Sequence, residues 1–289
     1  MPTPSDARRL FGTLVRQSDN QINLAEAALL IAAGQGSDTH TELCLSQLSA
    51  LAARVGTLLR LQGIEDPTRA PHETIATINK VLFEEEGFTG NEEDYYDVEN
   101  SFLDRVLARR VGIPITLSIV YIEVARLVGL TLHGIGLPGH FAVGYWSPGA
   151  GRMPDIILDP FNEGQVMTLE DCAARVHAAY GEDVVFTPEW LDPMSHKQIL
   201  IRVLNNLKHI HSAQDEHKAA LRTIDMLLML EPDAIWEVKE RGILYYRTGA
   251  FVPALADLRR YLKHAPRGDD TNLLRYYVDL LQRLIVCNN

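Results

Sequence analysis

The sequence predicts an α+β domain with a helical N-terminal part, followed by an all-α tail built of helical repeats. Up to Gly129, apolar residues recur mainly at helical spacing. The chain then becomes rich in β-branched and aromatic residues punctuated by Gly and Pro, which is typical of strands, until helical spacing returns at Leu169. Near the end of the chain, similar residues stand 34 positions apart, which indicates repeats. The expected domains are residues 1–192 and 193–289.

Four helices are expected in the N-terminal part. Residues 6–62 carry apolar side chains near helical spacing on both sides of a polar break at residues 38–41, so two helices are expected there. A linker at residues 63–71 separates them from a third helix over residues 75–83. The fourth is expected over residues 100–110, where an Asn-Ser pair offers capping side chains.

The next segment is expected to hold one helix and two strands. Pro114 suits the first turn of a helix, because its missing N–H would be unpaired there, and Gly129 suits the end of the same helix. Residues 140–146 and 155–159 are expected to form adjacent antiparallel strands, since both runs are rich in β-branched and aromatic residues and are joined by a Pro/Gly segment.

Residues 84–101 form a strongly acidic stretch with interspersed aromatic residues. Carboxylates bind hard cations, but the spacing fits no calcium-loop pattern, so a solvated loop held by its aromatic residues is the favoured interpretation. The neighbouring pair Arg109-Arg110 allows two interpretations: a site for a carboxylate or phosphate ligand, or salt bridges to nearby acids, of which the second is favoured. No metal and no cofactor is expected.

The tail carries the repeat. Pro232 and Pro266 are 34 residues apart, and so are Ala220 and Ala254. The second copy resembles a tetratricopeptide repeat, in which small residues let paired helices approach and aromatic residues fill the gaps. The residues that match its small, aromatic and terminating positions are Gly242, Tyr245, Gly249, Phe251, Ala254 and Pro266.

The first copy, residues 201–234, is degenerate, because Lys208 stands where the second copy has Gly242. Residues 271–285 are expected to form a closing helix. Usually at least three repeats are needed for such an array to fold alone, so these two repeats are expected to pack against the first domain for stability. The alternative is a helical tail with coincidental spacing.

Composition narrows the classes of function. Residues 1–192 carry a net charge of −14 and residues 193–289 one of +3, and an acidic chain repels phosphate backbones, so no nucleic-acid partner is expected. Apolar runs are too short to span a membrane and the N-terminus lacks a secretory signal, so a cytoplasmic location is expected. The three cysteines, Cys44, Cys172 and Cys287, lack the spacing of a disulfide framework or zinc site.

The middle of the chain resembles the transglutaminase-like (papain-like) core, in which a nucleophilic Cys begins a helix and His and Asp follow on two strands. The resemblance places Pro114 at the nucleophile position, because Gly112 precedes it and Gly129 closes the helix fifteen residues later. It also equates His140 and Asp159 with the family's His and Asp, and implies that the two form a hydrogen-bonded pair facing the first turn of that helix.

A longer set of residues is similar to the bacterial SirB-like proteins, which combine such a domain with tetratricopeptide repeats. The resemblance covers residues 20–266. The residues that carry it are Phe88, Gly90, Asn91, Tyr95, Tyr96, Asn100, Gly112, Ile113, Pro114, Pro138, Gly139, His140 and Phe141.

The absence of a cysteine at the nucleophile position determines which function is favoured. Proline offers no nucleophile, and the hydroxyls of Thr116 and Ser118, on the first turn, would need a strong base within hydrogen-bond distance. The favoured hypothesis is a non-catalytic interaction or regulatory protein that binds a protein or peptide partner. The alternative is a hydrolase or acyltransferase acting on amide bonds through His140, Asp159 and a hydroxyl or water nucleophile. The structural interpretation of His140 and Asp159 is a pair that ties two strands together.

Overall fold

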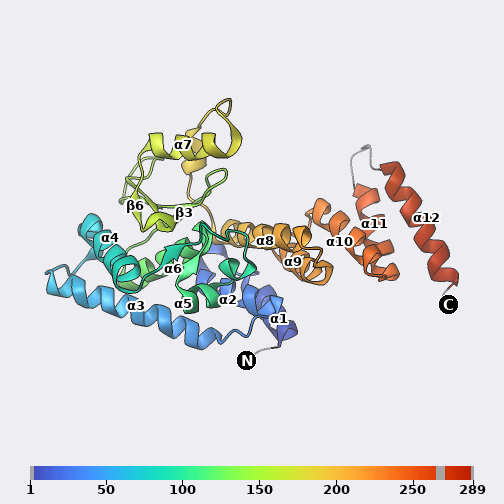
Figure 1. Ribbon diagram of the computed structural model, residues 1–289, viewed down its shortest axis with the longest axis horizontal. Coiled ribbons are helices and arrows are strands. Elements are labelled where there is room, and N and C mark those ends of the chain that lie inside the picture. The colour runs from blue at the N-terminus through green and yellow to red at the C-terminus, as the bar shows by residue number, and fades with distance from the viewer. Residues whose placement is uncertain (1–2, 265–270, 288–289) are drawn as a thin grey trace.

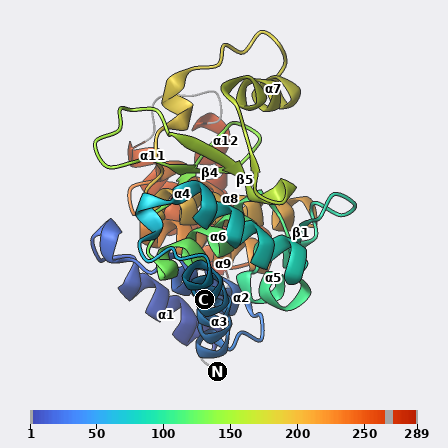
Figure 2. The ribbon, with the colours of Figure 1, turned by 90° about the vertical axis from the view of Figure 1, so that its left-hand side faces the viewer.

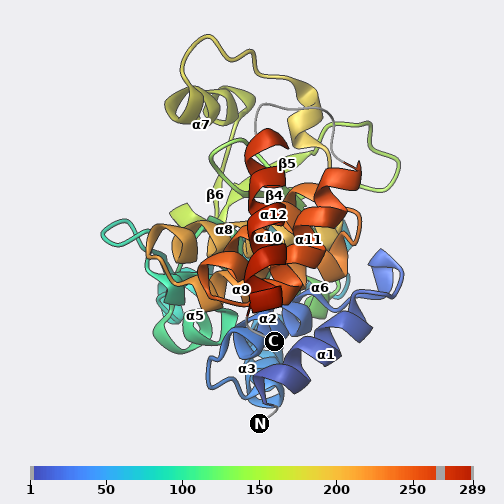
Figure 3. The same cartoon turned by 90° about the vertical axis from the view of Figure 1, so that its right-hand side faces the viewer.

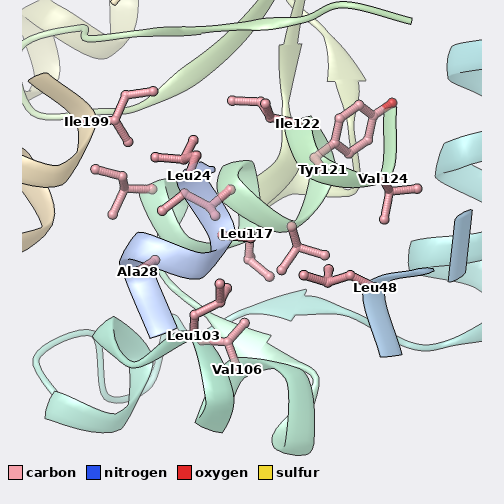
Figure 4. Close-up of a cluster of buried hydrophobic side chains, with 14 of the residues drawn as sticks. Leu24, Ala28, Leu48, Leu103, Val106, Leu117, Tyr121, Ile122, Val124 and Ile199 are labelled. Atoms are coloured by element: carbon pink, nitrogen blue, oxygen red, sulfur yellow. The ribbon is translucent and has the colours of Figure 1, made fainter. Parts of the chain in front are cut away.

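Helix α2 (Leu24–Gln35) lies at the centre of the first part of the chain, in a computed structural model that describes residues 3–264 and 271–287. Every residue of α2 except Glu26 is buried. A helix that is apolar on all sides must be surrounded by other elements, as α2 is. The helices that contact it are α1 (Pro4–Leu14), α3 (Thr41–Leu61), α5 (Leu103–Arg109), α6 (Pro114–Val128), α8 (His196–Ala213) and α9 (His217–Leu230). Figure 4 shows side chains from several of these helices meeting in the core.

Helix α6 begins and ends where the sequence predicts. Pro114 is its first residue, after the extended Ile113, and Gly129 closes it in the left-handed conformation with φ of 96°. Helix α4 (Pro71–Asn79) covers part of the expected third helix and continues as a π-helical turn, Lys80–Glu85. Single 3-10 turns lie at Asp19–Gln21, Pro67–Arg69, Val98–Ser101, Pro160–Asn162 and Pro188–Leu191.

The strands form two sheets. The larger is antiparallel, in the order β3 (His133–Ile135), β4 (Ala142–Tyr145), β5 (Ile156–Asp159) and β6 (Gln165–Val166). The expected strand pair is β4–β5, with Val143 opposite Leu158. The smaller sheet joins β1 (Thr89–Gly90) and β2 (Val111–Gly112) in parallel. These two strands, with β3 and β6, are too short for the sequence pattern to reveal.

The larger sheet is covered on both faces. Val143 and Leu158 belong to the main apolar cluster, which includes much of α6. The alternate residues Ala142 and Ile157 belong to a second cluster, with Cys172 of α7 (Leu169–Tyr180). Figure 2 shows the sheet between these two layers, with α7 above it and α6 below. Successive side chains of a strand point to opposite faces, so strand position decides which helix a residue meets.

The tail consists of paired helices, as the repeat predicts. After α8 and α9 come α10 (Ile235–Arg247), α11 (Phe251–His264) and α12 (Thr271–Cys287), which lie side by side in Figure 3 and extend away from the first part of the chain in Figure 1. A Cβ on Gly242 would stand 2.9 Å from a methyl of Leu258, so this glycine permits the close approach of α10 and α11. Pro266 lies outside the described residues.

The repeats divide between two apolar cores. Leu200, Leu204 and Leu227, from α8 and α9, belong to the main cluster of the first part. Ala254 of α11 and Leu281 of α12 belong to a separate cluster. The first repeat thus packs against the first domain, as expected of so short an array. Among the described residues, no helix is long and apolar enough to cross a membrane.

Candidate functional site

The first turn of α6 offers no exposed nucleophile. Pro114 is buried at its first position, and the hydroxyl of Thr116 is committed: it donates to the Asn100 carbonyl oxygen at 2.7 Å and accepts from the Ile113 backbone N–H at 3.2 Å. These bonds pair a backbone donor at the start of the helix and tie the helix to the 3-10 turn Val98–Ser101. Thr116 therefore acts as a capping residue.

Ser118 lies one turn after Pro114 on the same helical face. Its side chain is fully buried, and its Oγ has no hydrogen-bond partner among the described residues. A buried hydroxyl without a base is not activated as a nucleophile. The structure brings neither hydroxyl together with His140 or Asp159 in any hydrogen bond.

His140 and Asp159 do come together. The imidazole Nε2 lies 3.0 Å from Oδ2 of Asp159, and both side chains are buried. At this separation the two atoms make a close polar contact. His140 precedes β4 by two residues, and Arg202 of α8 donates to its backbone carbonyl at 2.5 Å.

Asp159 has further hydrogen-bond partners besides the predicted contact with His140. Its Oδ2 accepts from the Asn162 amide at 2.7 Å and from the Arg175 guanidinium at 3.0 Å, while Oδ1 accepts from the Phe161 backbone N–H at 3.1 Å. Burial raises the pKa of the Asp159 carboxyl, but the nearby His140, Asn162 and Arg175 outweigh burial and hold that pKa below its usual range. The carboxylate is therefore ionised at neutral pH and holds the strand end, the following turn and α7 together.

The Asp159 carboxylate lies on the face of the larger sheet that α7 covers. Along β5, Leu158 points toward α6, so Asp159 points toward α7, where Arg175 meets it. The His140 imidazole approaches the same oxygen and shares that side. We infer from the strand alternation that the pair faces α7 rather than the first turn of α6.

A pocket of about 280 Å³ adjoins Asp159 on this face. It lies between β6 and α7. Its lining residues are Asp159, Gln165, Val166, Met167, Asp171, Ala174, Arg175 and Ala178. The sequence reading missed Asn162 and Arg175. The Asp-Pro-Phe-Asn run is typical of a turn closed by an aspartate side chain and could have pointed to Asn162, whereas nothing in sequence singles out Arg175.

The described cysteines supply no alternative nucleophile. Cys172 is fully buried in the cluster between the sheet and α7, and burial, with nearby Asp171 and Asp159, raises the pKa of its thiol to about 11. Burial also raises the pKa of the Cys44 thiol on α3. A thiol that stays protonated at neutral pH is a poor nucleophile. The side chain of Cys287 lies outside the described part of the chain.

The acidic stretch is engaged in ion pairs. Arg109 binds Asp97 and Glu99 at 2.8 and 2.7 Å, and Arg110 binds Glu86 at 2.9 Å. The salt-bridge interpretation of the arginine pair therefore describes what the structure contains. In the part of the chain that the structure describes, no three His, Cys, Asp or Glu side chains gather as a metal site.

A larger groove lies in the repeats, between α8, α9 and α10. It measures about 480 Å³. The residues that line it are Asn205, Lys208, His209, Ser212, Ile224, Glu240, Ile243, Leu244 and Arg247. The ring of Tyr96 from the acidic stretch lies 6.1 Å from the ring of His209, which is one of these lining residues. All the residues that line the groove belong to α8, α9 and α10.

Comparison with known proteins agrees with this two-part organisation. A family model described as the transglutaminase-like superfamily matches residues 42–205, and a tetratricopeptide-repeat model matches residues 207–278. A UPF0162 protein of Xylella fastidiosa is 33% identical over 279 residues, which cover 94% of each chain. A UPF0162 protein of Vibrio cholerae is 30% identical over 203 residues, 70% of this chain and 73% of that protein.

A segment of a longer protein is also similar. Human F-box only protein 21 is 29% identical over 184 residues, which cover 61% of this chain and 28% of that protein. The domain order matches that expected from the resemblance to SirB-like proteins, and the α+β fold with a helical repeat tail is confirmed. The chain therefore belongs to the transglutaminase-like superfamily and, within it, to the bacterial UPF0162 family.

Proposed function

We propose that this protein is a non-catalytic protein-interaction protein that binds a peptide segment of a partner in the groove of its repeats. The observation that carries the proposal is the groove itself, which is open, lies between three repeat helices and combines an apolar floor with a polar rim. Concave surfaces of helical repeats bind extended or helical segments in this way.

The lining divides by burial into two sets. Ile224 is buried, and Ile243 and Leu244 are half-buried, so they offer an apolar floor for a side chain of the partner. Asn205 and Arg247 are exposed at the rim, where they suit backbone and carboxylate groups of a peptide. A few apolar anchors supply most of the affinity of such an interface, while the polar rim supplies direction.

The arrangement around α6 supports a non-catalytic role. The resemblance places Pro114, the first residue of α6, at the position of the family's nucleophile, and the Thr116 hydroxyl caps the helix. Asp159 is bound by Asn162 and Arg175, which favours a structural role for that carboxylate.

The replacement Leu244→Glu tests the groove. Affinity for the partner is expected to fall by about tenfold or more, because a charge on the apolar floor must be desolvated when the peptide binds. The control is Leu273→Glu on α12, an exposed position outside the groove. Wild-type and variant chains are used to enrich proteins from a bacterial lysate, and the enriched proteins are purified and titrated by calorimetry. Partners that bind the Leu244→Glu variant as tightly as the wild type would contradict the proposal.

A further inference from the structure

Strand β6 forms an open edge of the larger sheet. It is last in the strand order, and no described residue pairs with its outer side. At the opposite edge, β3 is partly covered by a bridge between Ile135 and Pro193. The Met167 N–H bonds inward to the Ile157 carbonyl oxygen, so by alternation the N–H and C=O of Val166 point outward. Val166 is also 63% exposed, and unpaired edges of this kind accept another strand.

Helix α7 lies over this open edge and leaves a groove beside it. Cys172 anchors the helix in the apolar cluster under it, and Val176, one turn further along, is also buried. The row that faces the groove recurs at helical spacing and consists of Asp171, Ala174, Arg175 and Ala178. The two alanines are exposed and short, so they leave room between α7 and the sheet. A strand added outside β6 would send alternate side chains into the pocket of about 280 Å³ beneath this row.

The size and charge of the pocket define the side chain that fits it. Pockets for drug-sized ligands measure about 300–1,000 Å³, so this smaller one suits a single side chain. Its charged residues are Asp159, Asp171 and Arg175, which give a net charge of −1 with both carboxylates ionised. Hydrogen bonds from Thr168 hold the pKa of Asp171 below its usual range. Among the described contacts, the hydrogen bonds from Thr168 go only to Oδ2 of Asp171, so Oδ1 of Asp171 is left for a ligand.

We propose that the β6 edge binds an extended peptide segment of a partner protein, with an Arg or Lys side chain of that segment in the pocket under α7. The backbone of Val166 pairs with the peptide backbone, as in other cases of strand addition, and the pocket supplies the selection. Asp171 binds the incoming cation. The net charge of −14 on residues 1–192 attracts basic segments to this part of the surface. This site is separate from the repeat groove and does not depend on it.

Three variants of the full-length chain test the proposal. Val166→Pro removes the outward N–H and leaves the bonds to β5 in place, since proline is tolerated on an edge strand. Val166→Thr keeps the N–H and is its matched control. Asp171→Asn removes the charge, while the amide oxygen still accepts from Thr168. Near-ultraviolet circular dichroism checks that each variant keeps the wild-type packing.

The probe is a random linear peptide library displayed on phage, selected on the wild type and counter-selected on the Val166→Pro variant. Selected peptides are expected to share one Arg or Lys among β-branched residues and to bind the Val166→Thr variant like the wild type. Their affinity is expected to fall about tenfold or more with Val166→Pro, with Asp171→Asn, or when the basic residue becomes Glu. The proposal fails if no peptide distinguishes the Val166→Pro variant, or if the distinguishing peptides lack a basic residue. A wild-type dimer that Val166→Pro dissociates would also overturn it, because the edge would then pair with a second copy.

Discussion

A fragment ending at residue 192 is expected not to fold, whereas a fragment ending at residue 231 is expected to fold cooperatively. The shorter fragment lacks α8 and α9, and it exposes the surfaces of α2 and α6 that these helices cover. Buried side chains are lost from the main cluster with them: Ile199, Leu200, Val203, Leu204, Leu207, Met226 and Leu227.

The burial free energy lost with these side chains exceeds the free energy of unfolding of a typical domain. Each such side chain contributes about 1.5–3 kcal/mol when fully buried, so the set is worth roughly 10–20 kcal/mol. The free energy of unfolding of a whole domain is about 5–15 kcal/mol. We infer that the first cooperative unit runs to the end of α9 rather than to residue 192. Thermal unfolding followed by circular dichroism checks this, and a cooperative transition in the fragment 1–192 at the temperature of the fragment 1–231 would refute it.

The replacement Asp159→Asn is expected to destabilise the protein by about 2–4 kcal/mol at neutral pH, because it removes the charge that Arg175 and the buried His140 contact closely. Because the pKa of Asp159 in the folded state is lowered, its contribution is fully present above the unfolded-state pKa of about 3.9. That contribution is lost as the pH falls through the lower folded-state pKa.

Urea unfolding between neutral pH and about pH 3 measures this difference. The free energies of unfolding of the wild type and the Asp159→Asn variant are expected to converge toward the acid end. Asp183→Asn, at an exposed carboxylate, serves as the matched control and is expected to change stability by less than about 0.5 kcal/mol. Two parallel curves, separated by the same amount at every pH, would show that the Asp159 charge does not supply the stability.

The sequence predicts elements with strong local signals. Pro114 and Gly129 define α6 because a missing N–H and a left-handed conformation are local requirements. The expected strand pair is β4–β5, since β-branched and aromatic residues mark both runs. Strands such as β6, with two residues, carry no period that a pattern can show.

The direction of the His140–Asp159 pair could not be read from the sequence. All residues of β4 and β5 are buried, since helices cover both faces of the sheet. Such strands lack the alternation of polar and apolar residues that identifies the inward face. The packing partner of α8 could not be predicted either. Its sequence pattern shows an apolar face but does not show which core that face packs into.

We infer that the first turn of α6 and the His140–Asp159 pair are separate sites. The direct test is the pH dependence of alkylation of a thiol introduced by Pro114→Cys, with Cys44, Cys172 and Cys287 replaced by alanine. Because the pair faces α7, the rate profile is expected to be the same with and without His140→Ala. A thiol pKa well below the usual ~8.5, which rises when His140 is replaced, would contradict the account, because it would place the imidazole beside the nucleophile position.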